Sequence, residues 1–313
     1  MMKKDITQNT AIKTNNFTAP PAKTATSVAK SMLSLTAEKL TVGYDSPIVK
    51  NVDLSIEAGK VTVLIGANGC GKSTLLKCLA RVLTPMSGQV LLNGKNIHRL
   101  PAKKIAKKMA LLPQGPIAPE GLSVKELVSQ GRYPHQSFFK QWSLEDEAAV
   151  EEAMQMADVT FLSDRAISDL SGGQRQRCWI AMVLAQQTGI ILLDEPTTYL
   201  DLKVQVDLLD LLTALAHQHQ RTLVLVLHEL NLAAAYADHL IMMKNGEIYT
   251  QGSPREVFNA DNLKAVFGLS ATVTIDDDNH SIICIPDKKS NVGNDKLINP
   301  VSLDTRSLTK VVS

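Results

Sequence analysis

The 313-residue sequence has no apolar run long enough to cross a lipid bilayer. Runs such as TLVLVL at residues 222–227 fall far short of the roughly 18 residues that a membrane-spanning helix requires. The sequence also contains no internal repeat. We therefore predict a chain that spans no membrane itself and that is not built from repeated units.

Cysteine is scarce, and its spacing excludes the common metal-binding patterns. The four cysteines, Cys70, Cys78, Cys178 and Cys284, form no C-x-x-C pair. They are expected to be reduced thiols. Cys70 lies in a glycine-rich loop, where we interpret it as a tolerated loop residue rather than a redox switch.

Charge of one sign does not dominate the sequence. The net charge is +2, with +4 in residues 1–34, +2 in residues 287–313 and therefore about −4 in residues 35–286. A nucleic-acid-binding protein usually presents a basic face. Because the charges look scattered, no nucleic-acid partner is expected.

The two ends of the chain lack the patterns of folded or targeting segments. Residues 1–34 are rich in Lys, Thr, Ala, Asn and Ser, but contain neither the arginines of a transit peptide nor the apolar stretch of a secretion signal. They are predicted to form a disordered N-terminal extension. Residues 287–313 are predicted to be a flexible C-terminal tail.

Between the ends, apolar strands alternate with amphipathic helices. Continuous apolar runs predict buried strands at 61–66, 190–196 and 222–228, and half-buried strands are expected at 35–44 and 48–57. Helices are expected at 73–83 and along the apolar face made by Val204, Leu208, Leu211, Leu212 and Leu215. An Asn-Gly pair at 245–246 predicts a hairpin. This alternation indicates an α/β fold with a mainly parallel sheet.

One region departs from this alternation and predicts a helical insert at about residues 115–180. Residues 143–157 begin with the capping pattern Ser143-x-x-Asp146. They then place Val150, Ala153, Met154 and Ala157 on one helical face. Met154 and Met156 are expected to pack rather than to contact a cofactor.

The stretch GANGCGKST follows the first buried strand and fits the phosphate-binding pattern G-x-x-x-x-G-K-[ST]. Glycines let the backbone turn tightly and aim N–H groups at phosphate, and the following helix adds positive potential. Lys72 is expected to reach the β- and γ-phosphates and Ser73 to ligate Mg²⁺. The predicted ATP-binding residues here are Gly66, Ala67, Asn68, Gly69, Cys70, Gly71, Lys72, Ser73 and Thr74.

A carboxylate pair ends the second buried strand, IILLDEP. Asp194 is expected to hold the Mg²⁺ shell, and Glu195 to order and polarise the attacking water. No acceptor-pocket motif of a kinase is found, and the Asn-Lys-x-Asp run of GTPases is absent. The pattern therefore favours an ATP hydrolase.

A second glycine-rich segment, LSGGQ, precedes a helix about a hundred residues after the phosphate loop. This string resembles the signature motif of the ATP-binding-cassette (ABC) family. In that family, two cassettes pair head to tail and each ATP lies between one phosphate loop and the other subunit's signature motif. The resemblance implies that Ser171, Gly172, Gly173 and Gln174 contact the ATP of a second copy.

Other single residues match the remaining family motifs, and they occur in the family's order along the chain. The resemblance implies that Tyr44 stacks on adenine, and that Gln114 contacts Mg²⁺ and the attacking water. It also implies that Asp201 crosses the dimer interface and that His228 contacts the γ-phosphate. The resemblance covers about residues 35–286 and implies a P-loop NTPase core with an antiparallel β-subdomain and a helical insert.

A free single cassette is the pattern of importers. An exporter cassette is usually fused to membrane helices, soluble cassette ATPases usually carry two cassettes, and DNA-repair cassettes have a long coiled coil between their motifs; none of these features is present. The finer resemblance is to importers of ferric siderophores, cobalamin and haem. The segment GRYPH at 131–135 most resembles the ferric-enterobactin type, unless Arg132 and Tyr133 only pack the insert.

This resemblance implies an ATPase on the cytoplasmic face of the inner membrane. Its expected partners are a second copy of the chain, separate transmembrane permease subunits and, indirectly, a periplasmic substrate-binding protein. ATP and Mg²⁺ are the implied cofactors. Two alternatives stay open: the same motor serving cobalamin or haem, and a soluble regulatory cassette without a permease.

Overall fold

The computed structural model describes residues 33–137, 142–276 and 281–288, which belong to one unit, Met32–Ser313. Nearly all of the extension predicted at 1–34 and of the tail predicted at 287–313 lies outside the described residues. Within the described part, no helix has the length and apolar character needed to span a membrane.

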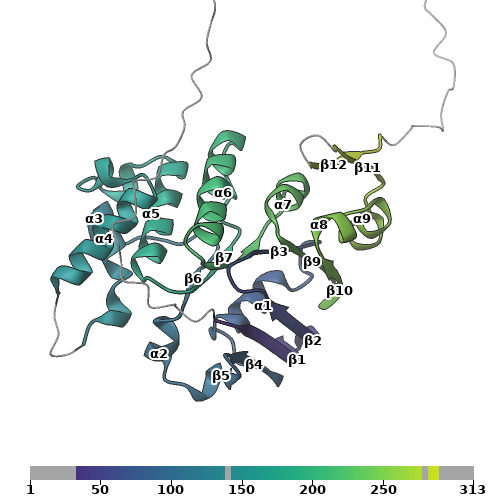
Figure 1. The fold of residues 1–313 in the computed structure, drawn as a ribbon, viewed down its shortest axis with the longest axis horizontal. Coiled ribbons are helices and arrows are strands. Elements are labelled where there is room, and N and C mark those ends of the chain that lie inside the picture. The colour runs from purple at the N-terminus through teal and green to yellow at the C-terminus, as the bar shows by residue number, and fades with distance from the viewer. Residues whose placement is uncertain (1–32, 138–141, 277–280, 289–313) are drawn as a thin grey trace, which may run out of the picture. The chain divides into compact units, whose positions relative to one another are not determined.

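A six-stranded sheet forms the centre of the fold (Figure 1). Its order is β10-β9-β3-β8-β7-β6, and every neighbouring pair except β10–β9 runs parallel. The mainly parallel sheet that the sequence predicted is therefore confirmed. The strands are β3 (Val61–Gly66), β6 (Met109–Leu112), β7 (Ile190–Asp194), β8 (Thr222–Val226), β9 (His239–Lys244) and β10 (Glu247–Gly252).

The predicted hairpin at Asn245-Gly246 joins β9 to β10. Lys244 pairs with Glu247 across the turn, and both turn residues have positive φ, 53° and 88°. Positive φ at both positions matches the twist of the flanking strands, which is why this dipeptide forms a tight hairpin.

Two smaller antiparallel sheets complete the strands. The first has the order β2-β1-β4-β5 and contains β1 (Leu35–Gly43), β2 (Pro47–Ile56), β4 (Ser87–Leu92) and β5 (Lys95–Asn96). The second pairs β11 (Ala271–Ile275) with β12 (Ile282–Pro286). The antiparallel β-subdomain expected from the family resemblance corresponds to the first of these sheets.

Side-chain alternation along the central strands divides the interior into two cores. On β3, Val63 and Ile65 enter one core, whereas Leu64 enters the other. The first core is filled mainly by the helices between residues 124 and 236, and the second by α1 (Lys72–Leu79) and the four-stranded sheet. Because apolar side chains leave β3 on both faces, its sequence is a continuous apolar run rather than an alternating one.

Three helices of the region between β6 and β7 pack on one another (Figure 1). They are α3 (Val124–Gln130), α4 (Leu144–Met156) and α5 (Gly172–Ala185), with short 3-10 turns at Tyr133–His135, Thr160–Leu162 and Ile167–Asp169. Ser143 and Asp146 form the predicted capping box of α4. Met154 is buried in the core and Met156 packs against it, as expected.

The remaining helices connect or follow the central strands. They are α2 (Ala102–Ala106), α6 (Leu202–His217), α7 (Leu230–Tyr236), α8 (Pro254–Val257) and α9 (Ala260–Phe267), with a 3-10 turn at Ile97–Arg99. The apolar face predicted on α6 is present, since Leu208, Leu212 and Leu215 are each about 1% exposed.

Three predicted boundaries were wrong by two residues or more. The helix expected at 73–83 ends at Leu79, because Arg81 adopts a left-handed φ of 65° that cannot continue a helix. The strand expected at 190–196 ends at Asp194, since Glu195 has a φ of 53°. The strand expected at 222–228 ends at Val226, two residues before His228.

Candidate nucleotide-binding and hydrolysis site

The glycine-rich loop joins the end of β3 to the start of α1, as the sequence predicted. Gly71 is the N-cap of α1, with a φ of 105°, and no side chain caps the helix. The first backbone N–H groups of a helix have no intrahelical partner, so Lys72, Ser73 and Thr74 present free donors at this end. Ala67, Asn68 and Gly69 are exposed, so the loop is open to solvent.

Lys72 folds back over the loop. Its side chain is buried, and Nζ donates hydrogen bonds of 2.8 Å to the Gly66 carbonyl and 3.2 Å to the Ala67 carbonyl. Gly66 is required here because a Cβ at this position would lie 2.4 Å from the Met243 carbonyl oxygen. The loop therefore holds a cation at its centre before any anion binds.

Cys70 is buried beside this cation, with its Sγ 4.0 Å from Lys72 Nζ. Burial raises the pKa of the Cys70 thiol, while the charge of Lys72 acts in the opposite direction. The thiol is therefore protonated at neutral pH, which fits its interpretation as a packing residue of the loop.

Ser73 and Asp194 bring two oxygen donors together from distant parts of the chain. The Ser73 hydroxyl donates a hydrogen bond of 2.8 Å to Oδ1 of Asp194. Burial raises the pKa of Asp194; the hydrogen bond from Ser73 lowers it, and the charge of Glu195 raises it further. A bound cation would relieve this unfavourable burial of charge, so the pair suits a hard ion such as Mg²⁺.

Three side chains converge on Glu195. Gln114 Nε2 donates a hydrogen bond of 2.6 Å to Oε2, Thr198 Oγ1 donates one of 3.2 Å to the same oxygen, and His228 Nε2 lies 2.5 Å from Oε1. Glu195 itself has a left-handed φ of 53°. Such strain concentrates at functional sites, where surrounding contacts keep it in place.

The LSGGQ segment forms the beginning of α5. Ser171 is the N-cap, and it forms a capping box with Gln174: Ser171 Oγ accepts from Gln174 N at 3.3 Å, and Ser171 N donates to Gln174 Oε1 at 3.1 Å. Gly172 and Gly173 follow as the first helical residues. The sequence predicted the position of this helix start but not the reciprocal cap.

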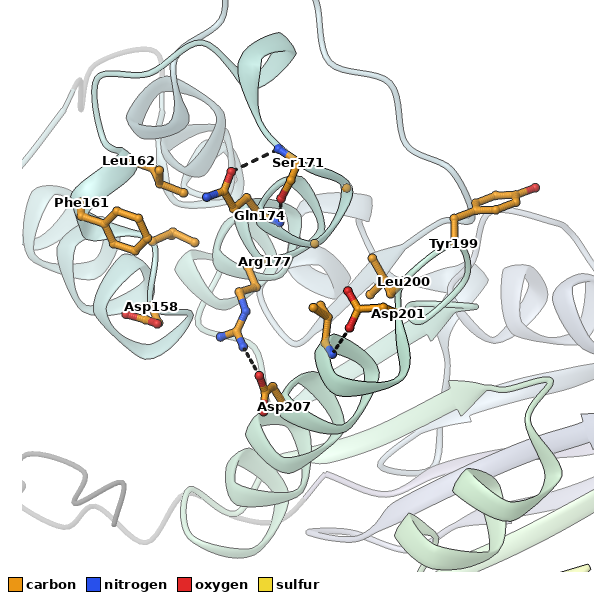
Figure 2. A pocket seen from close by; sticks show the side chains of 14 residues that line it. Asp158, Phe161, Leu162, Ser171, Gln174, Arg177, Tyr199, Leu200, Asp201 and Asp207 are labelled. Carbon is orange, nitrogen blue, oxygen red and sulfur yellow. Dashed lines mark hydrogen bonds and ion pairs between the residues drawn. The ribbon is translucent and has the colours of Figure 1, made fainter. Parts of the chain in front are cut away.

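A pocket of about 410 Å³ lies in front of this helix start (Figure 2). It is bordered by residues 158–162 after α4, by the signature residues and by the first turns of α6. Arg177 and Asp207 form an ion pair of 3.8 Å at its wall. No phosphate-loop residue lines this pocket.

A second pocket, of about 470 Å³, joins the Glu195 cluster to α5. Gln114, Asp194 and Glu195 line one part of it, and Gly172 and Trp179 another. The structure thus collects three of the predicted hydrolysis residues around one space, and His228, two residues after the end of β8, reaches Glu195.

Two predicted residues lie outside the Glu195 cluster, and one of them, Asp201, lines the pocket in front of the signature motif. Tyr44 is 57% exposed just after β1. Asp201 is the N-cap of α6, where its Oδ1 accepts a 3.0 Å hydrogen bond from Val204 N. The role of Asp201 as the N-cap of α6 was not predicted from the sequence.

The loop between Glu195 and Asp201 is held by a residue that the sequence analysis missed. Gln205 is buried on α6, and its Nε2 donates to the carbonyls of Thr197 and Leu200, each at 3.2 Å. The resulting loop projects Tyr199 outward with 99% of its surface exposed, away from Ser171 and Gln174 (Figure 2). A glutamine one turn into a helix gives no distinctive sequence signal.

Arg132 has a structural role in the helical region. Its Nε donates a 2.9 Å hydrogen bond to Asp146 Oδ1, and its Nη1 donates to the Ala185 carbonyl at 2.7 Å and to Gln187 Oε1 at 2.9 Å. The buried side chain therefore joins α3, α4 and α5. Tyr133 differs, since it is 79% exposed.

A parallel sheet with a glycine loop, a central lysine and a Ser–carboxylate pair defines a P-loop nucleotide hydrolase. Residues 49–198 match the family model described as "ABC transporter". The probable siderophore transport system ATP-binding protein YusV of Bacillus subtilis (strain 168) is 53% identical over 256 residues, covering 82% of this chain and 93% of that protein. The ferric enterobactin transport ATP-binding protein FepC of Escherichia coli (strain K12) is 47% identical, with 80% and 92% covered.

A solved structure is similar at lower identity. A putative metal-chelate type ABC transporter in an inward-facing conformation contains a chain that matches with a TM-score of 0.72 and 28% identity, covering 82% of this chain and 98% of that one. The chain belongs to the ABC transporter ATP-binding family, and it is an ATPase of that family. The resemblance inferred from the ordered motifs is thereby confirmed.

Proposed function

We propose that this chain is the ATP-hydrolysing subunit of an importer that takes up ferric siderophores through separate permease subunits. The observation that carries the proposal is that relatives named for siderophore transport match 47–53% of residues over more than nine-tenths of their length. Cassette motifs alone would fit any transporter, whereas identity over whole chains also includes the segments between the motifs.

We further propose roles for the residues of the hydrolysis site. Lys72 leaves its carbonyl partners to contact the β- and γ-phosphates, and the free N–H groups of α1 bind the same anion. Ser73 and Asp194, with Gln114 nearby, would hold Mg²⁺, which neutralises phosphate charge when bound. Glu195 orients the attacking water and accepts its proton, and Gln114, Thr198 and His228 keep its carboxylate in place.

Two copies are needed in this proposal. The pocket in front of the signature motif contains no residue of the same chain's phosphate loop, yet both segments present helix N-termini suited to phosphate. A head-to-tail pair places Ser171 and its neighbours over the ATP of the other copy. The exposed Tyr199 loop and Asp201 would then lie near the interface, and Tyr44 would stack on adenine.

The permease partners would contact the cassette near Gln114 and the following described residues, 115–137. The chain would lie on the cytoplasmic face of the inner membrane, and a periplasmic binding protein would deliver the cargo to the permease. Nothing in this arrangement requires the cassette to touch iron. Accordingly, the choice of siderophore would lie in the other subunits.

Uptake in cells tests the proposal. Cells lacking the chain are complemented with wild type, with Glu195→Gln, or with Glu247→Gln, which alters an exposed glutamate of β10 as a matched control. Labelled ferric catecholate and hydroxamate siderophores are supplied, with cobalamin and haem as comparators. We expect wild type and the control to restore uptake of one siderophore class, and Glu195→Gln to fail.

Other outcomes would change the assignment. Rescue of cobalamin or haem uptake instead would retain the motor and overturn the cargo. Wild-type complementation without any effect on uptake, together with no permease in purified membrane complexes, would contradict the importer function.

A further inference from the structure

The segment from Lys95 to Lys108, here called the basic segment, has an unusual charge. No aspartate or glutamate occurs between Glu57 and Glu120. Within this interval the basic segment gathers six cations in 14 residues: Lys95, Arg99, Lys103, Lys104, Lys107 and Lys108. The conclusion that charge is scattered along the sequence therefore fails for this segment.

Five of the six cations are exposed, on β5, on the 3-10 turn Ile97–Arg99, on α2 and directly after it, and Lys108 is half-buried. Ile97 and Ile105 turn inward and anchor the stretch, so the charged side chains face outward. Arg99, Lys104 and Lys107 are exposed. Lys103 donates a hydrogen bond to the Gln136 carbonyl, which neutralises no charge.

No carboxylate lies within ion-pair distance of these cations in the part of the chain that the structure describes, and the nearest that hydrogen bonds connect to the segment is Glu38, through Gln89 and Asn96. None of the ion pairs in that part involves a cation of the basic segment. The elements packed against α2 are β6, which is apolar, and the 3-10 turn Tyr133–His135, which contains a histidine and no acid. Six cations close together without paired carboxylates repel one another, so binding of an anionic partner would reduce this electrostatic repulsion.

The basic segment is continuous with the surface proposed to meet the permease. β6 leads directly from Lys108 to Gln114, a span of roughly 20 Å in an extended chain, and α2 touches the 3-10 turn at Tyr133–His135 within residues 115–137. In the proposed complex the permease spans the membrane beside this surface, so the basic segment would lie close to the bilayer.

We propose that the basic segment binds the anionic phospholipid headgroups of the membrane beside the permease. This inference rests on the proposed importer function. Clusters of four to eight Lys or Arg residues are attracted to the negative cytoplasmic leaflet. Cytoplasmic loops of membrane proteins are themselves enriched in Lys and Arg, so a permease loop is a poor partner for a basic surface, whereas lipid is a good one.

A vesicle-binding assay with the full-length chain tests this. Vesicles of phosphatidylcholine alone, or with one-third phosphatidylglycerol, are sedimented with wild type and with the triple variant Arg99→Gln/Lys104→Gln/Lys107→Gln. We expect wild type to bind only the anionic vesicles, half-molar salt to release it, and the triple variant to bind at least tenfold more weakly. The lysines of residues 1–34 are the same in every arm.

Two further variants make the result specific. Lys50→Gln/Arg255→Gln/Lys264→Gln removes the same charge from exposed positions on β2, α8 and α9, and should bind within twofold of wild type. Arg99→Lys/Lys104→Arg/Lys107→Arg keeps the charge and should bind like wild type. Thermal melting of each variant checks that the chain is folded.

Several results would overturn the proposal. Equal weakening of the two charge-removing variants would mean that only net charge matters, and loss of binding in the charge-preserving variant would mean that the effect is structural. Binding of wild type to RNA or DNA but not to anionic vesicles would assign the surface to nucleic acid. Failure here leaves the importer function intact, because siderophore uptake decides that function independently.

Discussion

The amide of Gln114 donates a 2.6 Å hydrogen bond to the carboxylate of Glu195, across 81 residues of sequence. Gln114 follows β6 and Glu195 follows β7, and these two strands are parallel neighbours. Residues that follow parallel strands meet at the same edge of a sheet, and this brings the loop proposed to meet the permease into contact with the proposed catalytic base. A movement of the Gln114 side chain would therefore break or shift its hydrogen bond to Glu195.

Replacing Glu195 with glutamine should nearly stop hydrolysis while ATP still binds. The amide retains the shape of the side chain but cannot accept the proton of water, and loss of a general base lowers turnover by about 100-fold or more. Phosphate release and ATP-dependent dimerisation in size-exclusion chromatography measure the two effects. Glu247→Gln is the control, and near-normal turnover by Glu195→Gln would remove the proposed role.

The head-to-tail arrangement predicts that two inactive variants complement each other. Lys72→Ala has an intact signature motif, and Ser171→Arg has an intact phosphate loop, so a mixed pair holds one complete site. The mixture should hydrolyse ATP faster than either variant alone. As a control, Lys72→Ala is mixed with a chain carrying both substitutions, which offers no intact phosphate loop and should stay inactive. Absence of any gain in the first mixture would mean that sites are not shared, or that both are needed.

The central strands and the local motifs could be predicted from the sequence because each depends on residues that are close together along the chain. β3 occupies the predicted range 61–66, and the Asn245-Gly246 turn and the Ser143–Asp146 cap were also predicted. These features depend on periodicity, turn chemistry and capping within a few residues. Gln205 could not be predicted in the same way, because its bonds to the carbonyls of Thr197 and Leu200 depend on how a loop folds back over a helix.

Arg132 illustrates the same limit for packing. The GRYPH segment identified a subfamily, but the sequence left open whether Arg132 had a functional role or only packed the insert. Its buried bonds to Asp146 and to the end of α5 favour the packing role. A buried ion pair between residues 14 positions apart has no sequence signature, since either residue alone is commonly exposed.

Removing Asp146 should destabilise the helical region. Asp146→Asn leaves Arg132 buried without its counter-charge, a change that costs about 3–5 kcal/mol in comparable pairs. Burial raises the pKa of Asp146, but hydrogen bonds from Ser143 and Arg132 outweigh this effect and hold it below its usual 3.8. The native carboxylate therefore stabilises the fold above that pH, and its contribution is lost as the pH falls through the lowered pKa.

Denaturation of wild type and Asp146→Asn across pH checks this. The stability difference should be constant from neutral pH to the mildly acidic range and should shrink only below pH 3.8. Glu145→Gln, at the neighbouring position on α4, is the control for loss of one negative charge from the same helix end. A difference that shrinks near neutral pH would contradict the assignment to Asp146.

Asp201 offers a way to separate capping from interface function. Asn is as good an N-cap as Asp, so Asp201→Asn should leave the melting temperature almost unchanged, whereas Asp201→Ala should cost about 1 kcal/mol. If Asp201 also acts across the dimer, Asp201→Asn should still lower ATPase activity. Full activity in Asp201→Asn would restrict the residue to its cap on α6.

The cap at the start of α5 has a consequence for how a phosphate is recognised. Ser171 Oγ uses a lone pair to accept the N–H of Gln174, and this leaves its own proton to be donated elsewhere. The hydroxyl can therefore bind an incoming oxyanion without releasing the helix. The same oxygen can thus accept the helix-capping hydrogen bond and donate to a phosphate, so the proposed contact would not require the cap at the start of α5 to open.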